Sequence, residues 1–312
     1  MSAKIKVAVL NDYQKVSQDF ADWSVLNKVA EVVVFNEPLT NIVETLYSFD
    51  VVCVMRERTP LKADLLAALP NLRLIVSTGF RNASIDVAAA EKLGITVKNT
   101  RYVWSGAPEM TWALLMALAR KIPEENQNFV SGKWQTTIGI DLEGKTIGLV
   151  GLGNIGSKIA SYAKVFGMHV IAWSENLTEE KATAAGAKLV TKEALFKDAD
   201  FVSIHLVLSD RSTGIITAKD LNNMKPSAFF INTSRAPLVD EEALIDVLQK
   251  RKIAGAAIDV FNQEPLPKDH IYRSMDNLLA TPHIGYVTEN TYKVFYPDTV
   301  KAIQDWVQTG SL

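Results

Sequence analysis

The first hundred residues alternate short apolar runs with segments whose apolar residues recur at helical spacing. The runs are too short for helices and end at polar turns, which is typical of buried strands. This alternation predicts a mostly parallel sheet with helices on both faces, and hence an α/β fold. The predicted strands span residues 5–10, 31–35, 50–55, 72–77 and 95–97, and the predicted helices span residues 41–47, 61–69 and 86–93.

A strongly apolar helix is predicted over residues 108–120. Its stretch from Trp112 to Ala119 is apolar nearly all round. Such a helix suits burial between domains or between subunits rather than a position that faces water. A polar segment, residues 124–144, separates it from the next strand.

The alternation resumes at residue 146 with a strand, a glycine-rich turn, a helix and a second strand. These elements are predicted at residues 146–150, 151–156, 157–166 and 169–173. The remaining predicted strands span residues 201–206, 228–232, 254–260 and 278–280, and the remaining helices span 240–250 and 288–307.

The glycine-rich turn has the spacing of a dinucleotide fingerprint. Gly151 allows a tight turn, Gly153 lets the backbone approach a pyrophosphate, and Gly156 lets the helix and strand pack closely. The start of the following helix adds free N–H groups and the positive end of the helix dipole. The alternative is a glycine turn in some other α/β protein, and the flanking strand–helix–strand pattern favours the nucleotide site.

Composition limits the partners of this protein. A chain of 312 residues fits two domains. A net charge of −2 without a basic run argues against nucleic acid, and no apolar stretch reaches the roughly 20 residues of a membrane span. The first residues lead directly into a strand-like segment, which argues against a signal peptide. The single cysteine, Cys53, excludes an intrachain disulfide and favours a reducing, cytoplasmic setting.

Four motifs in order suggest a family. They are Gly151–Gly156, Asn232–Arg235, Asp259–Pro267 and Thr281–Gly285. With these motifs at this spacing, the chain resembles the D-isomer-specific 2-hydroxyacid dehydrogenases, whose relatives include phosphoglycerate, glycerate and D-lactate dehydrogenases. The resemblance extends from about residue 51 to about residue 285.

The resemblance implies two doubly wound parallel-sheet domains. Residues 100–284 would form a Rossmann dinucleotide-binding domain, and residues 1–99 and 285–312 a smaller, flavodoxin-like substrate-binding domain. The hinge would lie near residues 99–101 and 284–286. The region of helix 108–120 would help to form a two-fold homodimer.

Three residues form the predicted catalytic set. His283 is a natural proton donor because an unperturbed imidazole titrates near neutral pH. Glu264 can orient the imidazole and stabilise its charged form, and Arg235 can offer a planar fork of donors to a substrate carboxylate or carbonyl oxygen. Taken singly they could be a capping histidine, a turn carboxylate and a surface ion pair. Together they follow three predicted strand ends, which favours catalysis, and the resemblance assigns the same three positions.

The resemblance also implies the contacts to the cofactor. The family usually has Asp where this chain has Ser174, so the ribose would be bound by Ser174 and the neighbouring Glu175, whose charge would oppose a 2′-phosphate. NAD(H) is therefore favoured, and NADP(H) remains open. The predicted cofactor-binding residues are Gly151, Gly153, Asn154, Ile155, Gly156, Ser174, Glu175, His205, Thr233 and Asp259, with Asp259 at the nicotinamide carboxamide.

The predicted substrate site combines Arg235 with a loop near residue 78. By resemblance, the backbone N–H groups of Ser77, Thr78 and Gly79 would hold the substrate carboxylate. Arg56 would contact the distal end of the substrate, and Arg58 is the alternative candidate for this contact.

Several positions depart from the family pattern. Ala236 and Tyr286 stand where the family often has glycine. A positive φ at Ala236 would strain the loop, and Tyr286 would add bulk near the pocket. Aromatic residues at positions 80, 102 and 104 suggest an unusual substrate side chain.

The leading hypothesis is therefore a dehydrogenase that reduces a 2-keto acid to the D-2-hydroxy acid. The alternative from a different class is a dinucleotide-sensing interaction protein, as in related corepressors, because fold alone does not separate the two. A third, less favoured hypothesis is an enzyme that oxidises formate or phosphite. No group of His, Cys, Asp or Glu has metal-ligand spacing, so no metal is predicted.

Overall fold

The computed structural model describes residues 4–309, which divide into two compact units. Unit 1 comprises residues 4–103 and 287–309, and unit 2 comprises residues 104–286. The sequence analysis placed these divisions at residues 99/100 and 284/285. Each unit contains its own parallel sheet, which confirms the predicted α/β class with two doubly wound domains.

Unit 1 contains a five-stranded parallel sheet in the order β2-β1-β3-β4-β5. This order reverses between β1 and β3, as in flavodoxin-like folds. The strands are β1 (Ile5–Val9), β2 (Ala30–Val34), β3 (Val51–Val54), β4 (Leu74–Ser77) and β5 (Thr96–Asn99). Both β3 and β4 are buried along their whole length, and this explains why they read as continuous apolar runs.

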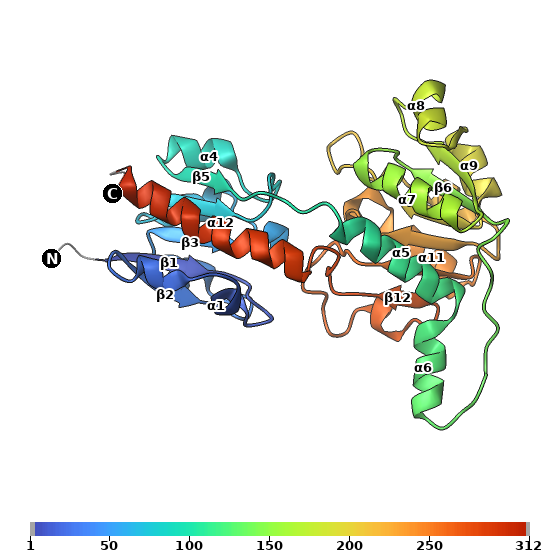
Figure 1. Cartoon of the computed structure of the whole chain (residues 1–312), viewed down its shortest axis with the longest axis horizontal. Helices are drawn as coiled ribbons and strands as arrows, with labels where there is room; N and C mark the ends of the chain where they lie inside the picture. The colour runs from blue at the N-terminus through green and yellow to red at the C-terminus, as the bar shows by residue number, and fades with distance from the viewer. Residues whose placement is uncertain (1–3, 310–312) are drawn as a thin grey trace. The chain divides into compact units, whose positions relative to one another are not determined.

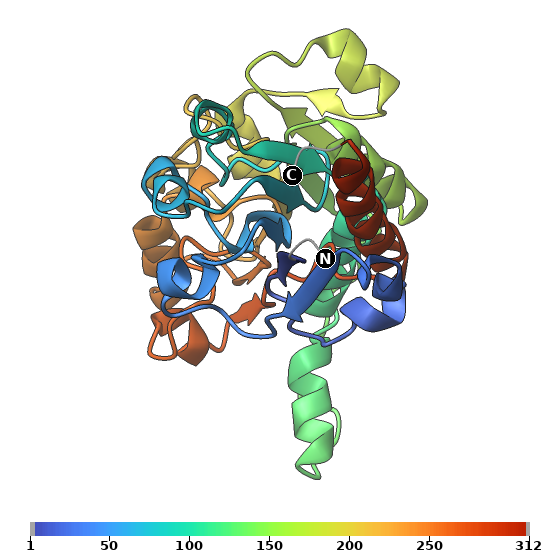
Figure 2. The ribbon, with the colours of Figure 1, turned by 90° about the vertical axis from the view of Figure 1, so that its left-hand side faces the viewer.

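Short helices and one long helix cover the sheet of unit 1. The long helix, α12, runs beside α1 (Figures 1 and 2) and also packs on β4. The helices are α1 (Ser17–Phe20), η1 (Trp23–Leu26), α2 (Ile42–Leu46), η2 (Arg56–Arg58), α3 (Ala63–Ala67), α4 (Val87–Lys92) and α12 (Glu289–Gln308), where η denotes a 3₁₀ helix.

The predicted start of the helix at residues 61–69 was wrong. The sequence placed it at Leu61, but Leu61 forms a parallel bridge with Ile85. Helix α3 therefore begins at Ala63, with Lys62 as the N-cap residue. A bridge between two residues 24 positions apart therefore excludes Leu61 from the helix, and the sequence around Leu61 gives no indication of it.

Unit 2 contains a seven-stranded parallel sheet in the order β12-β11-β10-β9-β6-β7-β8. The chain reverses direction along the sheet between β6 and β9, which is the Rossmann arrangement. The strands are β6 (Thr146–Val150), β7 (His169–Trp173), β8 (Lys188–Leu189), β9 (Phe201–Ile204), β10 (Phe229–Asn232), β11 (Gly255–Ile258) and β12 (Leu278–Ala280). The sequence analysis missed β8, which has only two residues.

Helices cover both faces of this sheet, and α6 stands apart from it. The helices of unit 2 are α5 (Gly106–Ala119), α6 (Ile122–Val130), α7 (Asn154–Val165), α8 (Glu179–Ala184), α9 (Lys192–Asp198), α10 (Ala218–Asn222), η3 (Ala236–Leu238), α11 (Glu241–Gln249) and η4 (Ile271–Ser274). The apolar helix predicted at 108–120 corresponds to α5, whose Leu114, Leu115 and Ala119 belong to the core of the sheet. Burial of α5 is thus largely within its own unit.

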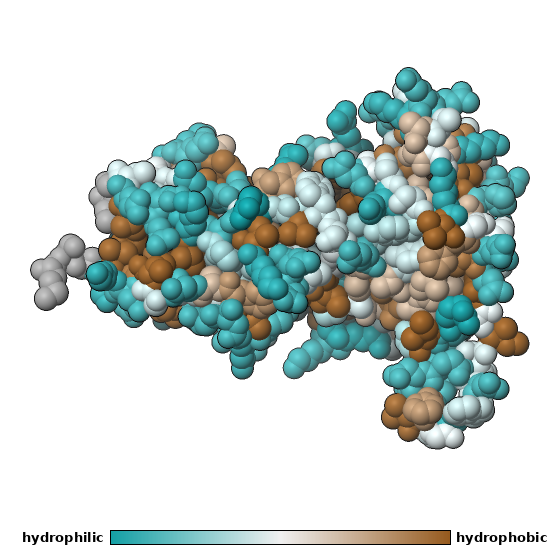
Figure 3. All heavy atoms as spheres, in the orientation of Figure 1, coloured by the Kyte–Doolittle hydropathy of each residue, from teal (hydrophilic) through white to brown (hydrophobic). Residues whose placement is uncertain are grey.

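Helix α6 was not predicted. It extends away from the rest of unit 2 (Figures 1 and 2), and none of its residues is buried. We call residues 122–138, which comprise α6 and the chain after it, the arm. Figure 3 shows apolar side chains at the surface of this region. The exposed large apolar residues of the arm are Ile122, Phe129, Val130, Trp134 and Ile138.

Within residues 4–309, no helix combines the length and the apolar character that crossing a membrane requires.

Candidate active site

Two glycines shape the turn after β6. The backbone of Gly151 is left-handed, with φ +99°, and a Cβ there would lie 2.7 Å from the carbonyl oxygen of His205. A Cβ on Gly156 would lie 2.2 Å from the carbonyl oxygen of Gly151. Only glycine satisfies both positions, because the turn, the first turn of α7 and the end of β9 are in backbone contact.

Gly153 is different, because a Cβ at this position would meet no atom within 4 Å. It is the N-cap residue of α7, with φ −77°. The N–H groups of Asn154, Ile155 and Gly156 form the first turn of α7, where helical geometry provides no acceptor. Open space in front of a helix N-terminus suits a phosphate, so this cradle fits the pyrophosphate of a dinucleotide.

His205 follows β9 and lies against the glycine turn. Its side chain is buried, and Nε2 is 2.9 Å from Oγ of Ser203. Burial lowers the pKa of His205 to about 3, so the ring is neutral near neutral pH. Nδ1 has no hydrogen-bond partner within residues 4–309. A role for His205 near the cofactor stays a prediction.

The end of β7 is acidic. Ser174 is half-buried and Glu175 is exposed, and the N–H of Leu177 donates to the carbonyl of Ser174. The first turn of α8 adds Glu179 and Glu180. Glu175 thus lies directly after the second strand of this Rossmann unit, and its contact with the adenosine ribose stays a prediction.

The chain after β10 presents Arg235. The side-chain amide of Asn232 donates to the carbonyl of Arg235 at 3.0 Å and accepts from the N–H of Ser234 at 3.0 Å. The Ser234 hydroxyl donates to the carbonyl of Ile204 at 2.8 Å, which ties the loop to β9. Thr233 Oγ1 lies 2.6 Å from Oγ1 of Thr111 on α5. These bonds hold the backbone that carries the half-buried Arg235.

His283 and Glu264 form a hydrogen-bonded pair, with Nδ1 of the imidazole 2.6 Å from Oε2 of the carboxylate. Glu264 Oε1 accepts from the N–H of Phe261 at 3.0 Å, so both oxygens are held. The side chains of His283 and Glu264 are 15% and 25% exposed. The imidazole therefore keeps Nε2 for a ligand, because Nδ1 is occupied.

Asp259 holds the loop that carries His283. Oδ1 accepts from the Thr281 hydroxyl at 2.6 Å and the N–H of Ile284 at 2.9 Å, and Oδ2 accepts from the N–H of Gly285 at 2.7 Å. Burial raises the pKa of Asp259, although these three donors oppose that shift. The sequence analysis assigned Asp259 to the nicotinamide and missed this anchoring, as it missed Thr281.

Arg235, Glu264 and His283 follow the adjacent strands β10, β11 and β12. Since the carboxyl ends of parallel strands share one edge of the sheet, all three stand at the same edge as the glycine cradle after β6. The departures from the family pattern are accommodated. Ala236 lies in η3, outside the positive-φ residues, so the anticipated strain is absent. The ring of Tyr286 is 5.6 Å from that of His283.

The predicted substrate loop lies in unit 1, and its N–H groups already donate within that unit. Thr78 N–H donates to the carbonyl of Val54 at 3.1 Å, and Gly79 N–H donates to Thr100 Oγ1 at 2.7 Å. Ser77 is paired within the sheet. A carboxylate held by Thr78 and Gly79 would have to replace these bonds. The carboxylate-binding role of this loop stays a prediction.

Arg56 is also committed within unit 1. It is 8% exposed, and Nη1 donates to the carbonyls of Thr78 at 3.0 Å and Arg81 at 3.2 Å. Nη2 lies 3.1 Å from Oε1 of Glu57. Arg56 therefore supports the loop, and its contact with the distal end of the substrate stays a prediction.

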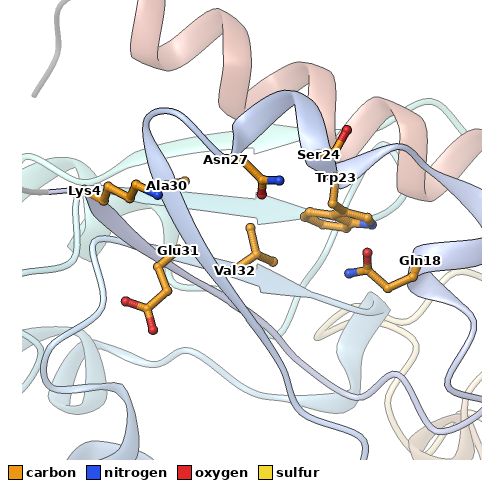
Figure 4. Close-up of a pocket in the computed structure, with 8 residues that line it drawn as sticks. All are labelled: Lys4, Gln18, Trp23, Ser24, Asn27, Ala30, Glu31 and Val32. Carbon is orange, nitrogen blue, oxygen red and sulfur yellow. The ribbon is translucent and has the colours of Figure 1, made fainter.

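Two further observations concern a hollow in unit 1 and possible metal ligands. A hollow of about 490 Å³ in unit 1 (Figure 4) contains none of the predicted site residues. Its lining is mostly polar: Lys4, Gln18, Trp23, Ser24, Asn27, Ala30, Glu31 and Val32. Across residues 4–309 no three His, Cys, Asp or Glu side chains are placed to hold a metal ion.

The fold and the glycine cradle define an α/β protein of the dinucleotide-binding type, and comparison with known proteins gives its family. A sequence model described as the D-isomer specific 2-hydroxyacid dehydrogenase, NAD binding domain, matches residues 112–285. The chain belongs to the D-isomer specific 2-hydroxyacid dehydrogenase family, which confirms the resemblance seen in the sequence.

Three relatives illustrate the similarity. A D-3-phosphoglycerate dehydrogenase from Synechocystis sp. is 35% identical over 96% of this chain and 54% of its own length. A glyoxylate reductase from Aeropyrum pernix is 38% identical over 73% of this chain and 71% of its own. The crystal structure of a phosphoglycerate oxidoreductase from Vibrio cholerae has a TM-score of 0.92 and 36% identity, covering 98% of this chain and 99% of that one. The chain thus spans about half the length of the curated phosphoglycerate dehydrogenases it matches.

Proposed function

We propose that this protein is a nicotinamide-dependent dehydrogenase that interconverts a 2-keto acid and the D-2-hydroxy acid. The observation that carries the proposal is the His283–Glu264 pair, at 2.6 Å, on the same sheet edge as the glycine cradle. Family membership supports it. Unit 2 would bind the cofactor and unit 1 would contribute to substrate binding.

The residues divide the chemistry of a carbonyl reduction. A dinucleotide held at its pyrophosphate by the glycine cradle would, in its reduced form, supply the hydride that the carbonyl carbon accepts. The carbonyl oxygen gains negative charge as the C=O π bond breaks, and Nε2 of His283 gives it a proton. Glu264 stabilises the imidazolium before transfer and fixes the ring. In the opposite direction the neutral ring takes that proton back.

Arg235 would bind the substrate. Its guanidinium offers planar, paired donors that match a carboxylate or the carbonyl oxygen beside it. The bonds from Asn232 and Ser234 fix the backbone from which this side chain extends. We assign no metal to the reaction, since a protonated histidine and an arginine suffice to neutralise the developing charge.

NAD(H) is the cofactor we favour over NADP(H). Glu175 can accept hydrogen bonds from the ribose hydroxyls, and together with Glu179 and Glu180 it would repel a 2′-phosphate. Lys192, whose Nζ lies 5.6 Å from the Trp173 ring centroid, is paired with Asp220 at 2.6 Å. Its charge is therefore partly neutralised.

A spectrophotometric screen tests the proposed function. The purified chain should oxidise NADH, faster than NADPH, with at least one of glyoxylate, pyruvate, hydroxypyruvate, phenylpyruvate and 3-phosphohydroxypyruvate. With any of these substrates except glyoxylate, whose product is achiral, chiral chromatography should show the D isomer. Tight NADH binding without turnover of any keto acid would contradict the proposal and favour the dinucleotide-sensing alternative.

The arm supports a homodimer. Glu125 on α6 accepts hydrogen bonds from the N–H and hydroxyl of Thr136, at 3.0 and 2.7 Å, and from the N–H of Thr137 at 2.6 Å. The arm is therefore a braced structure and not a loose loop. Since exposed apolar groups on a braced surface are typical of interfaces, we propose that the arm packs on a second copy of the chain.

The lone Cys53 supports a cytoplasmic setting.

Light scattering on a sizing column tests the dimer. The wild-type chain should elute at twice its 34.4 kDa mass. Val130→Glu, at a position 78% exposed, should convert it largely to monomer because a charge would be buried in the contact. Val43→Glu, on exposed α2, is the matched control and should remain dimeric. A monomeric wild type at micromolar concentration would rule out the dimer.

A further inference from the structure

The backbone of His283 has a conformation that residues with a side chain rarely adopt. Its φ is +53°, in the left-handed region that favours glycine. The N–H of His283 donates to the carbonyl of Thr281 at 2.9 Å, so the chain turns tightly around Pro282. A residue keeps such a conformation only where the surrounding contacts impose it, and these residues cluster at functional sites.

The contacts on the C-terminal side of His283 converge on the carboxylate of Asp259. Its oxygens accept from the N–H groups of Ile284 at 2.9 Å and Gly285 at 2.7 Å. The backbone of Asp259 extends the pairing of β10 and β11, because its N–H donates to the carbonyl of Asn232 at 3.0 Å. The two residues after His283 are therefore fastened to the end of the sheet.

Thr281 holds the same carboxylate from the N-terminal side. Its hydroxyl donates to Asp259 Oδ1 at 2.6 Å, and its N–H donates to the carbonyl of Ile258, the last residue of β11, at 3.0 Å. Oδ1 thus accepts from Thr281 and from Ile284, one on each side of His283. All of these residues belong to unit 2. The backbone of His283 is clamped between two points that share one oxygen atom.

The position of the imidazole depends on this clamp. Nδ1 of His283 lies 2.6 Å from Oε2 of Glu264. One hydrogen bond to Nδ1 lets the ring pivot about that atom, so it does not place Nε2 by itself. Nε2 is placed only when the backbone from which the ring extends is fixed as well.

We propose that Thr281 is a positioning residue for the reaction. Its hydroxyl, through Asp259, keeps His283 in the left-handed conformation that aims Nε2 at the substrate oxygen. This inference rests on the proposed function. A misplacement of about 1 Å in a reacting group can cost roughly 100-fold in rate, whereas a single hydrogen bond contributes only modestly to the stability of a fold. The rate should therefore respond to Thr281 more strongly than the fold does.

Thr281→Val tests the proposal because it removes the hydroxyl and nearly keeps the shape of the side chain. With the full chain, NADH and the keto acid that the wild type reduces best, kcat should fall by about tenfold or more. The Kd of NADH, measured by fluorescence titration, should change by less than about threefold. Thr281→Ser keeps the hydroxyl and should have a kcat within about threefold of the wild type.

Thr217→Val is the matched control. The hydroxyl of Thr217 also donates to a carboxylate of unit 2, Asp220 Oδ2, at 2.8 Å. Both valine variants should lower the melting temperature, since each loses one such bond, but Thr217→Val should keep the kcat of the wild type. Thr281→Ala removes the same hydroxyl without placing a methyl group beside Asp259. It should be as slow as Thr281→Val, which keeps the test valid if the valine variant does not fold.

A double variant shows whether Thr281 acts through His283. If it does, Thr281→Val should add little to the loss in His283→Ala, because the proton donor is already absent. Losses that multiply would refute the positioning role, as would wild-type kcat in Thr281→Val, a serine variant as slow as the valine variant, or a loss of NADH affinity as large as the loss of kcat. Each of these outcomes leaves the proposed function standing, whereas a wild type that reduces no keto acid rejects both.

Discussion

Replacement of His283 by alanine is expected to lower kcat for keto-acid reduction by roughly 10²–10⁴, the range typical of general acid–base groups. The affinity for NADH should change little, because the imidazole acts on the substrate oxygen. Stopped-flow and steady-state rates with NADH measure the first quantity, and fluorescence titration measures the second. His169→Ala, at an exposed position on β7, is the control and should retain full activity. Full activity of His283→Ala would overturn the assignment of this site.

The partner of His283 should have a different signature. Glu264→Gln keeps an oxygen that can accept from the imidazole but removes the negative charge, so the imidazolium loses its stabilisation. The variant should therefore lower kcat by less than His283→Ala does, roughly tenfold, because the ring that donates the proton remains. The single side-chain oxygen of glutamine can accept from the imidazole or from the Phe261 N–H, and not from both. A variant with the kcat of the wild type would remove Glu264 from the mechanism.

Replacement of Gly153 by valine should abolish dinucleotide binding and leave the fold intact. No atom lies within 4 Å of a Cβ at this position and its φ is −77°, so the side chain adds no strain to the free protein. It would instead occupy the space in front of α7 that the pyrophosphate needs. Fluorescence titration with NADH measures the binding, and circular dichroism with thermal melting reports the fold.

Gly156 provides the contrast. A Cβ there would lie 2.2 Å from the carbonyl oxygen of Gly151, so Gly156→Val should lower the melting temperature as well as binding. Loss of binding in both variants, with loss of stability only at Gly156, identifies Gly153 as the ligand-facing glycine. Undiminished NADH affinity of a folded Gly153→Val protein would reject the cradle.

The sequence alone determined the features that depend on local pattern. Strands buried on both faces, such as β3, β4 and β9, form continuous apolar runs that periodicity detects. The glycine-rich turn could be predicted from the sequence because its close backbone contacts admit only glycine at two positions. The positions of Arg235, Glu264 and His283 could be predicted because residues that follow parallel strands gather at one edge of a sheet, whereas their catalytic roles stay a proposal.

Elements without a local pattern escaped prediction. Strand β8 has two residues, too few to show any periodicity. Helix α6 buries none of its residues, so it lacks the covered apolar stripe by which helices are usually recognised. The start of α3 depends on the bridge between Leu61 and Ile85, which the sequence around Leu61 does not encode.

Only the tertiary structure decided which partners the polar groups have within the protein. Arg56, a predicted substrate contact, donates to the carbonyl of Arg81, 25 positions away. Gly79 N–H is taken by Thr100, and Asp259 is taken by the loop that carries His283. Sequence reports the donors and acceptors that a chain contains. Their partners are set by which distant segments the fold brings within about 3 Å, because a hydrogen bond acts only at that range.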